Sequence, residues 1–106
     1  KQETEQPECD AMISNLSQVF LMVKTADCLP ILVDAPMGVI AAIHAGRRGT
    51  ISEITKQTLM KMNDVFQVDL NKTILWLGPA ICVDCYEILI PNNPFDKSLH
   101  IMNNYI

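Results

Sequence analysis

The sequence has no long hydrophobic run, no excess of basic residues, and few histidines or aromatic residues. Eight Lys and Arg against twelve Asp and Glu give a formal net charge of -4 over 106 residues, which excludes the basic surface typical of a duplex-DNA-binding domain. The longest apolar stretch, Gly38 to Ala45, is interrupted by His44 and is far too short to cross a bilayer. The first ten residues are polar and acidic, so no signal peptide is visible. We therefore expect a cytoplasmic protein that binds neither nucleic acid nor membrane.

What the sequence does contain predicts a folded α+β domain. Apolar residues make up 49% of the chain and charged residues 19%, a balance typical of globular proteins. An apolar stripe of helical period predicts a helix from Ile51 to Phe66, and the capping box Thr50 to Glu53 predicts Thr50 as its N-cap. Runs rich in β-forming residues predict strands over residues 18–24, 29–34, 39–44, 73–77 and 86–90. We expect an α/β layered sandwich, whose mixed sheet contains hairpins and carries at least one packed helix.

The four cysteines do not indicate a disulfide framework, because nothing else in the sequence is typical of a secreted protein. Cys82 and Cys85 have C-x-x-C spacing, but a structural zinc site would need a second such pair. A thioredoxin-like site would need the pair where a strand leads into a helix, and here another predicted strand follows. We interpret Cys82 and Cys85 as two small, partly buried thiols.

Cys28 and His44 are expected to lie side by side. The predicted hairpin over residues 29–44 turns at Pro36-Met37-Gly38, so antiparallel pairing brings its two ends together. A neighbouring Cys and His form either part of a metal site or a nucleophile with its base. The structural alternative is a buried thiol next to a strand-end histidine.

Two aspartates near this pair have several interpretations. Asp27 precedes Cys28 and either orients His44, acts as an acid, base or ligand, or caps the turn through its side chain; we place the turn role first. The role of Asp10 has the same alternatives. His100 stands in a polar tail, where a solvated surface position is expected.

A glycine-containing turn follows His44 and leads into the predicted helix. Helix N-termini present free N–H groups and a positive dipole end, and guanidinium groups suit phosphate oxygens. The alternative is an ordinary turn with solvated arginines. We predict an anion site there, whose candidate residues are Arg47, Arg48, Gly49 and Thr50.

Several segments together resemble one known family, the YfiH-type proteins, which carry the older labels "laccase domain" and "multicopper polyphenol oxidase". Thr25 to Leu32 (TADCLPIL) resembles the family motif TADC-x-P, and His44 to Thr50 (HAGRRGT) is similar to HAGWRGT. Similar segments lie at Asp10 to Ile13, Leu77 to Ile81 and Tyr86-Glu87. Because order and spacing agree from residue 10 to residue 88, the resemblance is specific.

The resemblance implies a metal-dependent enzyme that phosphorolyses adenosine, inosine, guanosine or methylthioadenosine, or deaminates adenosine. It also implies a layered fold similar to that of CNF-type Cys/His deamidases. The implied metal is zinc, with copper as the alternative, held by a Cys and two His. Cys28 and His44 match two of these ligands, but no histidine precedes Cys28, so we expect the third from a partner chain or from His100. A multicopper oxidase would need many more histidines than the two present.

Two further departures from the family pattern concern Arg47, where the family usually has Trp, and Cys82, where it usually has Gly. The family domain is also longer, so residues 1–106 are expected to be the central part of a single domain that continues beyond both ends. A homo-oligomer is a further expectation.

The expected mechanism uses Cys28, His44, Asp27 and Arg48. The metal on Cys28 and His44 would polarise the substrate or activate water, and Asp27 would move a proton or orient a ligand. Arg48 and the helix start at Thr50 would hold the co-substrate phosphate. The alternatives are a Cys/His amide hydrolase and a degenerate domain that binds without turnover.

Overall fold

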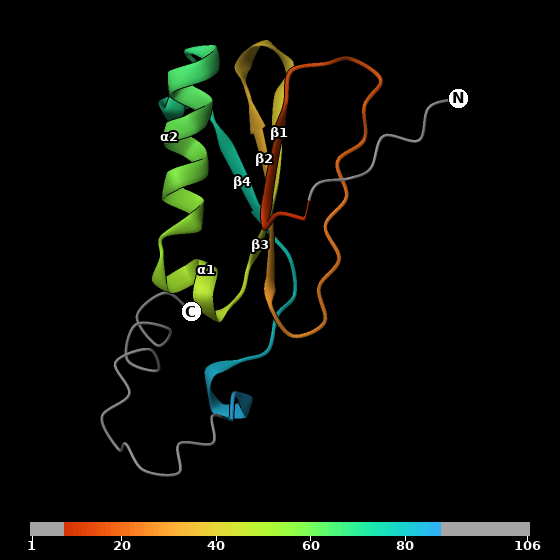
Figure 1. The fold of residues 1–106 in the computed structure, drawn as a ribbon, viewed down its shortest axis with the longest axis vertical. Helices are drawn as coiled ribbons and strands as arrows, with labels where there is room; N and C mark the ends of the chain where they lie inside the picture. Colours follow the sequence, from red (N-terminus) through yellow and green to blue (C-terminus); the bar gives the residue numbers. More distant parts are fainter. Residues whose placement is uncertain (1–7, 88–106) are drawn as a thin grey trace.

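The computed structural model describes residues 8–87, and these form a sheet with a helical layer on one side (Figure 1). The strands are β1 (Ala11–Ser14), β2 (Leu29–Ala35), β3 (Val39–Ala45) and β4 (Ile74–Leu77). The helices are α1 (Arg47–Ile51) and α2 (Ile54–Phe66), with short 3-10 helices η1 (Pro36–Gly38), η2 (Leu70–Lys72) and η3 (Val83–Cys85). The expected α+β class is confirmed.

The strands lie in the order β1-β3-β2-β4. All pairings in this sheet are antiparallel, where the sequence suggested a mixed sheet. β2 and β3 form the predicted hairpin, whose turn contains Met37 and Gly38, both at positive φ. β3 is central and mostly buried, because β1 and β2 flank it and alternate residues face the helical layer.

The core lies between the sheet and α2. Ile43 and Met62 are fully buried, and Val39 is 2% exposed. Thr58 is the buried polar residue among those described, and its hydroxyl donates to the Ile54 carbonyl at 2.7 Å. The helix therefore buries one stripe of side chains against β3 and β1, as its apolar period predicts.

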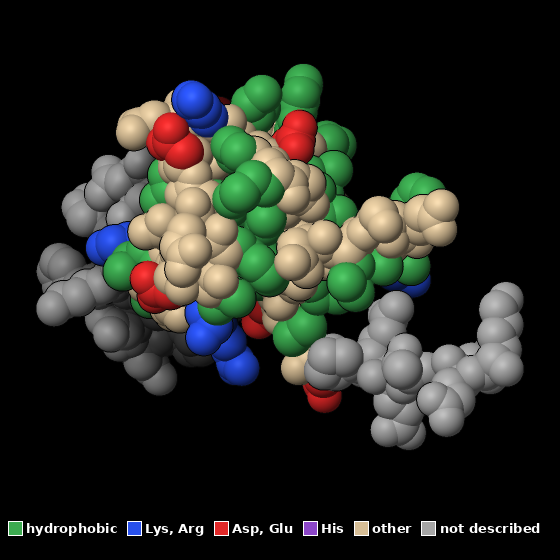
Figure 2. Space-filling model, turned by 90° about the horizontal axis from the view of Figure 1, so that it is seen from above, with side chains coloured by type: hydrophobic (Ala, Val, Ile, Leu, Met, Phe, Trp, Pro, Cys, Tyr) green, Lys and Arg blue, Asp and Glu red, His purple; other side chains and the backbone are tan. Residues whose placement is uncertain are grey.

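The opposite face of the sheet is only partly covered. Residues 15–28 run along the side away from α2 (Figure 1), and Met22 and Val23 line a hollow with Ala42 and His44. Nearer β4, Leu32 is 48% exposed and Trp76 62% exposed. Hydrophobic side chains also reach the surface at the hairpin end of the molecule, seen from above in Figure 2.

The predicted strand over residues 18–24 is wrong, because this segment has no regular structure. Phe20 is 96% exposed, and Gln18 has a φ of 61°, which breaks an extended run. β propensity needs a neighbouring strand to become structure. Here β1, a segment with no predicted strand, occupies the free side of β3.

The prediction of Thr50 as N-cap is also wrong. Helix α1 begins at Arg47, four residues before the predicted start, with Gly46 as N-cap, and Glu53 at φ 58° separates α1 from α2. The Ser52 hydroxyl donates back to the carbonyls of Arg48 and Gly49, so it ends α1 rather than continuing a single helix. The predicted end at Phe66 agrees with the structure.

The predicted strand over residues 86–90 falls mostly outside the described residues, and Tyr86 and Glu87 have no regular structure. No helix within residues 8–87 has the length and apolar character to cross a membrane.

Met62→Ala should destabilise the protein by about 2–5 kcal/mol, because it removes a fully buried side chain and leaves a cavity. Met60→Ala is the matched control, since Met60 lies on the same helix but is 53% exposed, and its effect should stay within about 0.5 kcal/mol. Urea unfolding of both variants measures the difference. Equal losses would show that α2 does not pack as described.

Candidate functional site

The β2–β3 register brings Cys28 and His44 to the same point. Pro30 pairs with His44, so Cys28, two residues before Pro30, lies opposite Gly46 at the end of the hairpin. A Cβ placed on Gly46 would lie 3.2 Å from Cys28 Sγ, 3.1 Å from His44 Cε1 and 3.6 Å from His44 Nε2. The thiol and the imidazole therefore converge over a glycine that leaves room for both.

Asp10 holds the imidazole of His44 from the other side. The Asp10 carboxylate lies 3.2 Å from His44 Nδ1, and the His44 backbone N–H donates to the Asp10 carbonyl at 2.7 Å. Because an ionised carboxylate only accepts, this contact places the ring proton on Nδ1. Nε2 is then the unprotonated ring nitrogen, as in metal-ligating histidines whose other ring N–H is held by a carboxylate.

The sequence left the role of Asp10 open because that role depends on β1. Pairing of Ala11 with Ile43 brings the residue before β1 next to His44. β1 is only four residues long and has no strong strand pattern. A search for acidic residues next to short apolar segments could have found this contact.

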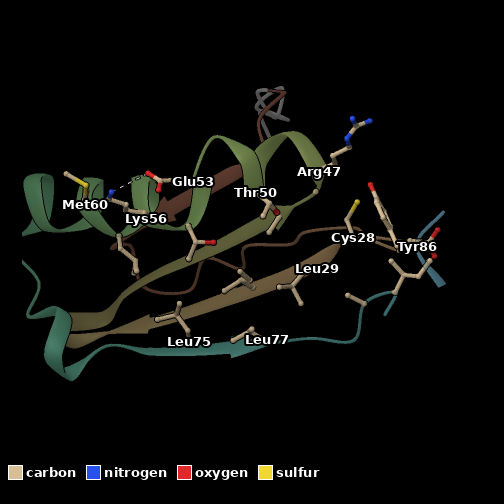
Figure 3. Close-up of a pocket in the computed structure, with 18 of the residues that line it drawn as sticks. Cys28, Leu29, Arg47, Thr50, Glu53, Lys56, Met60, Leu75, Leu77 and Tyr86 are labelled. Atoms are coloured by element: carbon tan, nitrogen blue, oxygen red, sulfur yellow. Dashed lines mark hydrogen bonds and ion pairs between the residues drawn. The ribbon is translucent and has the colours of Figure 1, made fainter. Parts of the chain in front are cut away.

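A largely apolar pocket of about 540 Å³ adjoins Cys28, between the sheet and the helical layer. Figure 3 shows Cys28, Arg47 and Tyr86 at one end, Glu53, Lys56 and Met60 at the other, and Leu29, Leu75 and Leu77 along the sheet side. Lys56 and Glu53 form an exposed ion pair at 3.3 Å. The volume is within the range of small-molecule sites. Charged side chains lie at its two ends, and Thr50 lies between them (Figure 3).

Two backbone hydrogen bonds bring the segment after β4 to this pocket. Gly78 N–H donates to the Pro30 carbonyl at 2.9 Å, and Ile81 N–H donates to the Asp27 carbonyl at 3.0 Å. The second bond holds the chain beside Cys28, so that Tyr86 closes the same end of the pocket (Figure 3). Asp27 also lines the pocket, with its side chain exposed.

The residues predicted to bind phosphate do not all face the pocket. Arg47 and Thr50 line it, whereas Arg48 is exposed and is not among the lining residues. Gly49 is buried, and a Cβ there would lie 3.1 Å from Ile54, so this glycine permits close packing of α1 on α2. Thr50 N–H already donates to the Gly46 carbonyl at 2.8 Å. The N–H groups of Arg48 and Gly49 belong to the first helical turn, where a backbone amide has no carbonyl acceptor within the helix.

The donor set around Gly46 suits zinc or copper in kind, because thiolate and imidazole are ligands of both metals. Within residues 8–87, however, no group of three His, Cys, Asp or Glu side chains could hold a metal ion. A catalytic zinc needs three protein ligands. Among the described residues, Cys28 and His44 are the two candidates that the sequence predicted as ligands, and His100 lies outside these residues.

Cys82 is the N-cap of η3 and Cys85 its last residue, and both are exposed, so the expectation that these thiols are partly buried is wrong. Cys9, Cys28, Cys82 and Cys85 are all free thiols.

These features occur in a chain that matches a known family model. Residues 1–99 match the family described as multi-copper polyphenol oxidoreductase laccase. The chain belongs to this family. The resemblance to YfiH-type proteins is thereby confirmed.

Characterised relatives carry nucleoside-enzyme names. The chain is 40% identical over 80 residues to a purine nucleoside phosphorylase of Bacteroides thetaiotaomicron. The aligned region covers 74% of this chain and 30% of the relative. It is 39% identical over 90 residues to an adenosine deaminase of an unknown prokaryotic organism, over 83% of this chain and 34% of the relative. The chain therefore spans about a third of the length of these relatives.

A solved structure supports the fold. The crystal structure of YlmD from Geobacillus stearothermophilus superimposes with a TM-score of 0.71 at 28% identity, covering 80% of this chain and 36% of that one. The described sheet and helices therefore have the YfiH-like arrangement.

Asp10→Ala should remove the preference of His44 for the tautomer protonated on Nδ1. With Asp10 present, neutral His44 should carry its proton on Nδ1 because of the 3.2 Å contact. In Asp10→Ala the Nε2-protonated form should become prominent, and Asp10→Asn, whose amide oxygen still accepts, should retain part of the original preference. Long-range ¹H–¹⁵N spectra of the imidazoles measure this, with His100→Gln assigning the second histidine. An identical tautomer in all three proteins would contradict the role given to Asp10.

Proposed function

We propose that the protein carrying this segment is a metal-dependent enzyme that phosphorolyses purine nucleosides. The observation that carries the proposal is the convergence of Cys28 and His44 over Gly46. Cys28 lines the end of a pocket of nucleoside size on the helix side of the sheet, whereas His44 lines the hollow on the other face. The names of the relatives supply the substrate class.

Cys28 and His44 are the proposed metal ligands, with Asp10 orienting His44. Zinc is the metal we favour, and a third ligand would come from outside the described residues. A bound metal would supply Lewis-acid polarisation of the substrate or activation of water.

Phosphorolysis replaces the bond between the ribose C1′ and the base with a bond to a phosphate oxygen, and the departing base takes up a proton. Arg47 lines the pocket, and its side chain is proposed to bind phosphate together with Arg48 and the first-turn amides of Arg48 and Gly49. Asp27 stands at the same end and is proposed to handle the proton. Thr50 can contact phosphate only through its side chain, because its backbone N–H already donates to the Gly46 carbonyl.

The apolar walls of the pocket suit the purine and the less polar face of the ribose. Leu29 and Leu77 supply the sheet side, and Tyr86 lies at the Cys28 end (Figure 3). A tyrosine ring can stack on a base while its hydroxyl remains available for hydrogen bonding.

Adenosine deamination is the second candidate, because one relative with 39% identity carries that name. The two activities differ in their need for phosphate. Release of ammonia from adenosine without phosphate indicates deamination, whereas base release that depends on phosphate indicates phosphorolysis.

Cys28→Ala and His44→Ala should each lower kcat/KM for inosine phosphorolysis by about 100-fold or more, with a parallel loss of bound zinc, because each removes a metal ligand. The assay uses the protein that carries this segment, with inosine and phosphate. Elemental analysis of each variant measures the metal.

Cys82→Ala is the control, since Cys82 is exposed and does not line the pocket, and its activity should match that of the unmodified protein. Unchanged turnover in Cys28→Ala and His44→Ala would overturn the metal proposal. Iodoacetamide labelling of Cys28 that substrate blocks, combined with activity that resists chelators, would instead support a cysteine nucleophile. A metal-free protein without turnover would support a binding domain.

A further inference from the structure

Cys82 and Cys85 sit on one exposed turn that holds their side chains together. Cys85 N–H donates to the Cys82 carbonyl at 3.1 Å, which closes a turn of the i to i+3 type. Side chains at i and i+3 of a 3-10 turn lie above one another, and the Cα atoms of such a turn are less than about 7 Å apart. A disulfide needs Cα atoms about 4.4–6.8 Å apart, so the turn suits one.

The pKa values of the two thiols depend on each other. A hydrogen bond from the Cys85 side chain lowers the pKa of the Cys82 thiol, with help from the backbone N–H groups of Cys85 and Asp84. The same contact raises the pKa of the Cys85 thiol. Cys82 is thus the readier thiolate of the pair, and thiolates are the attacking species in disulfide exchange.

Other roles fit these cysteines less well. Both thiols are exposed, so they do not fill the core. Two thiolates alone do not make a structural zinc site, and no third ligand joins them among the described residues. Neither thiol lines the pocket beside Cys28, so the pair is separate from the candidate metal site.

We propose that Cys82 and Cys85 form a reversible dithiol–disulfide site that exchanges with small-molecule disulfides such as oxidised glutathione. The Cys82 thiolate attacks one sulfur of the small disulfide, which forms a mixed disulfide and releases one thiolate. The Cys85 thiolate then attacks the Cys82 sulfur, which closes the protein disulfide and releases the second thiolate. The two protons lost by the protein pass to the two released thiols, and the small disulfide is the oxidant.

The redox state of Cys82 and Cys85 can affect the pocket, because the residues on either side of this pair contact it or are anchored beside it. Ile81, immediately before Cys82, is tied to the Asp27 carbonyl at 3.0 Å, and Tyr86, immediately after Cys85, lines the pocket. Closing the disulfide would therefore stiffen the turn between an anchored residue and a pocket residue.

The experiment treats the reduced chain with oxidised glutathione, blocks remaining thiols with N-ethylmaleimide at mildly acidic pH, and digests with trypsin. Residues 73–97 form one tryptic peptide that contains both cysteines. The expected product is this peptide with neither thiol alkylated and two hydrogens missing, restored to the dithiol by dithiothreitol. In Cys85→Ser, the mixed disulfide with glutathione should accumulate on Cys82, because the second attack cannot occur.

Cys9 is the internal control, because it is exposed and its thiol is free. It should carry glutathione as a mixed disulfide under the same conditions. A peptide 73–97 that keeps both thiols while Cys9 reacts would overturn the proposal, as would pairing of Cys82 or Cys85 with Cys28.

Discussion

The antiparallel register of β2 against β3 is the constraint on which the site depends. Pairing of Leu29 with Ala45 sets which residues lie opposite each other where the hairpin ends, and so places Cys28 across from Gly46. A slip of one residue would turn every side chain of β2 to the other face. Such a slip would bury the exposed side chains of β2, expose its buried ones, and separate the Cys28 thiol from the His44 imidazole. Stability and site geometry thus rest on the same ladder of backbone hydrogen bonds.

Two residues next to the β2–β3 pairing, Gly46 and Asp10, complete the geometry of the candidate site. Gly46 leaves open the volume into which Cys28 and His44 project, and Asp10 fixes the ring from the adjacent strand β1. The site is therefore built from three neighbouring strand ends, with the pocket beginning on the helix side of the same sheet. Such placement on rigid strand ends gives more precise positioning than loops alone would give.

Local patterns predicted much of this arrangement. The hairpin, the central strand and the meeting of Cys28 with His44 follow from two adjacent segments and a short turn, so little long-range information is needed. Residues 18–24 were mispredicted because their β-forming residues find no strand partner, and partners are a tertiary property. Thr50 failed as an N-cap because Gly46 and Ser52 offer a competing start and stop. The contact between Asp10 and His44 depends on where β1 pairs in the sheet. A strand of four residues has too short a pattern to be predicted from the sequence.

The uneven covering of the sheet has a consequence for spectroscopy. Trp76 is the single tryptophan of the sequence, and it lies 62% exposed beside Leu32 on the face away from α2. Leu75 and Leu77, its neighbours in the chain, point to the other side and line the pocket. Intrinsic fluorescence therefore samples the polarity of the outer face. A ligand entering the pocket has the sheet between it and the indole, so tryptophan emission is a poor indicator of occupancy there and a direct one of anything that covers the outer face.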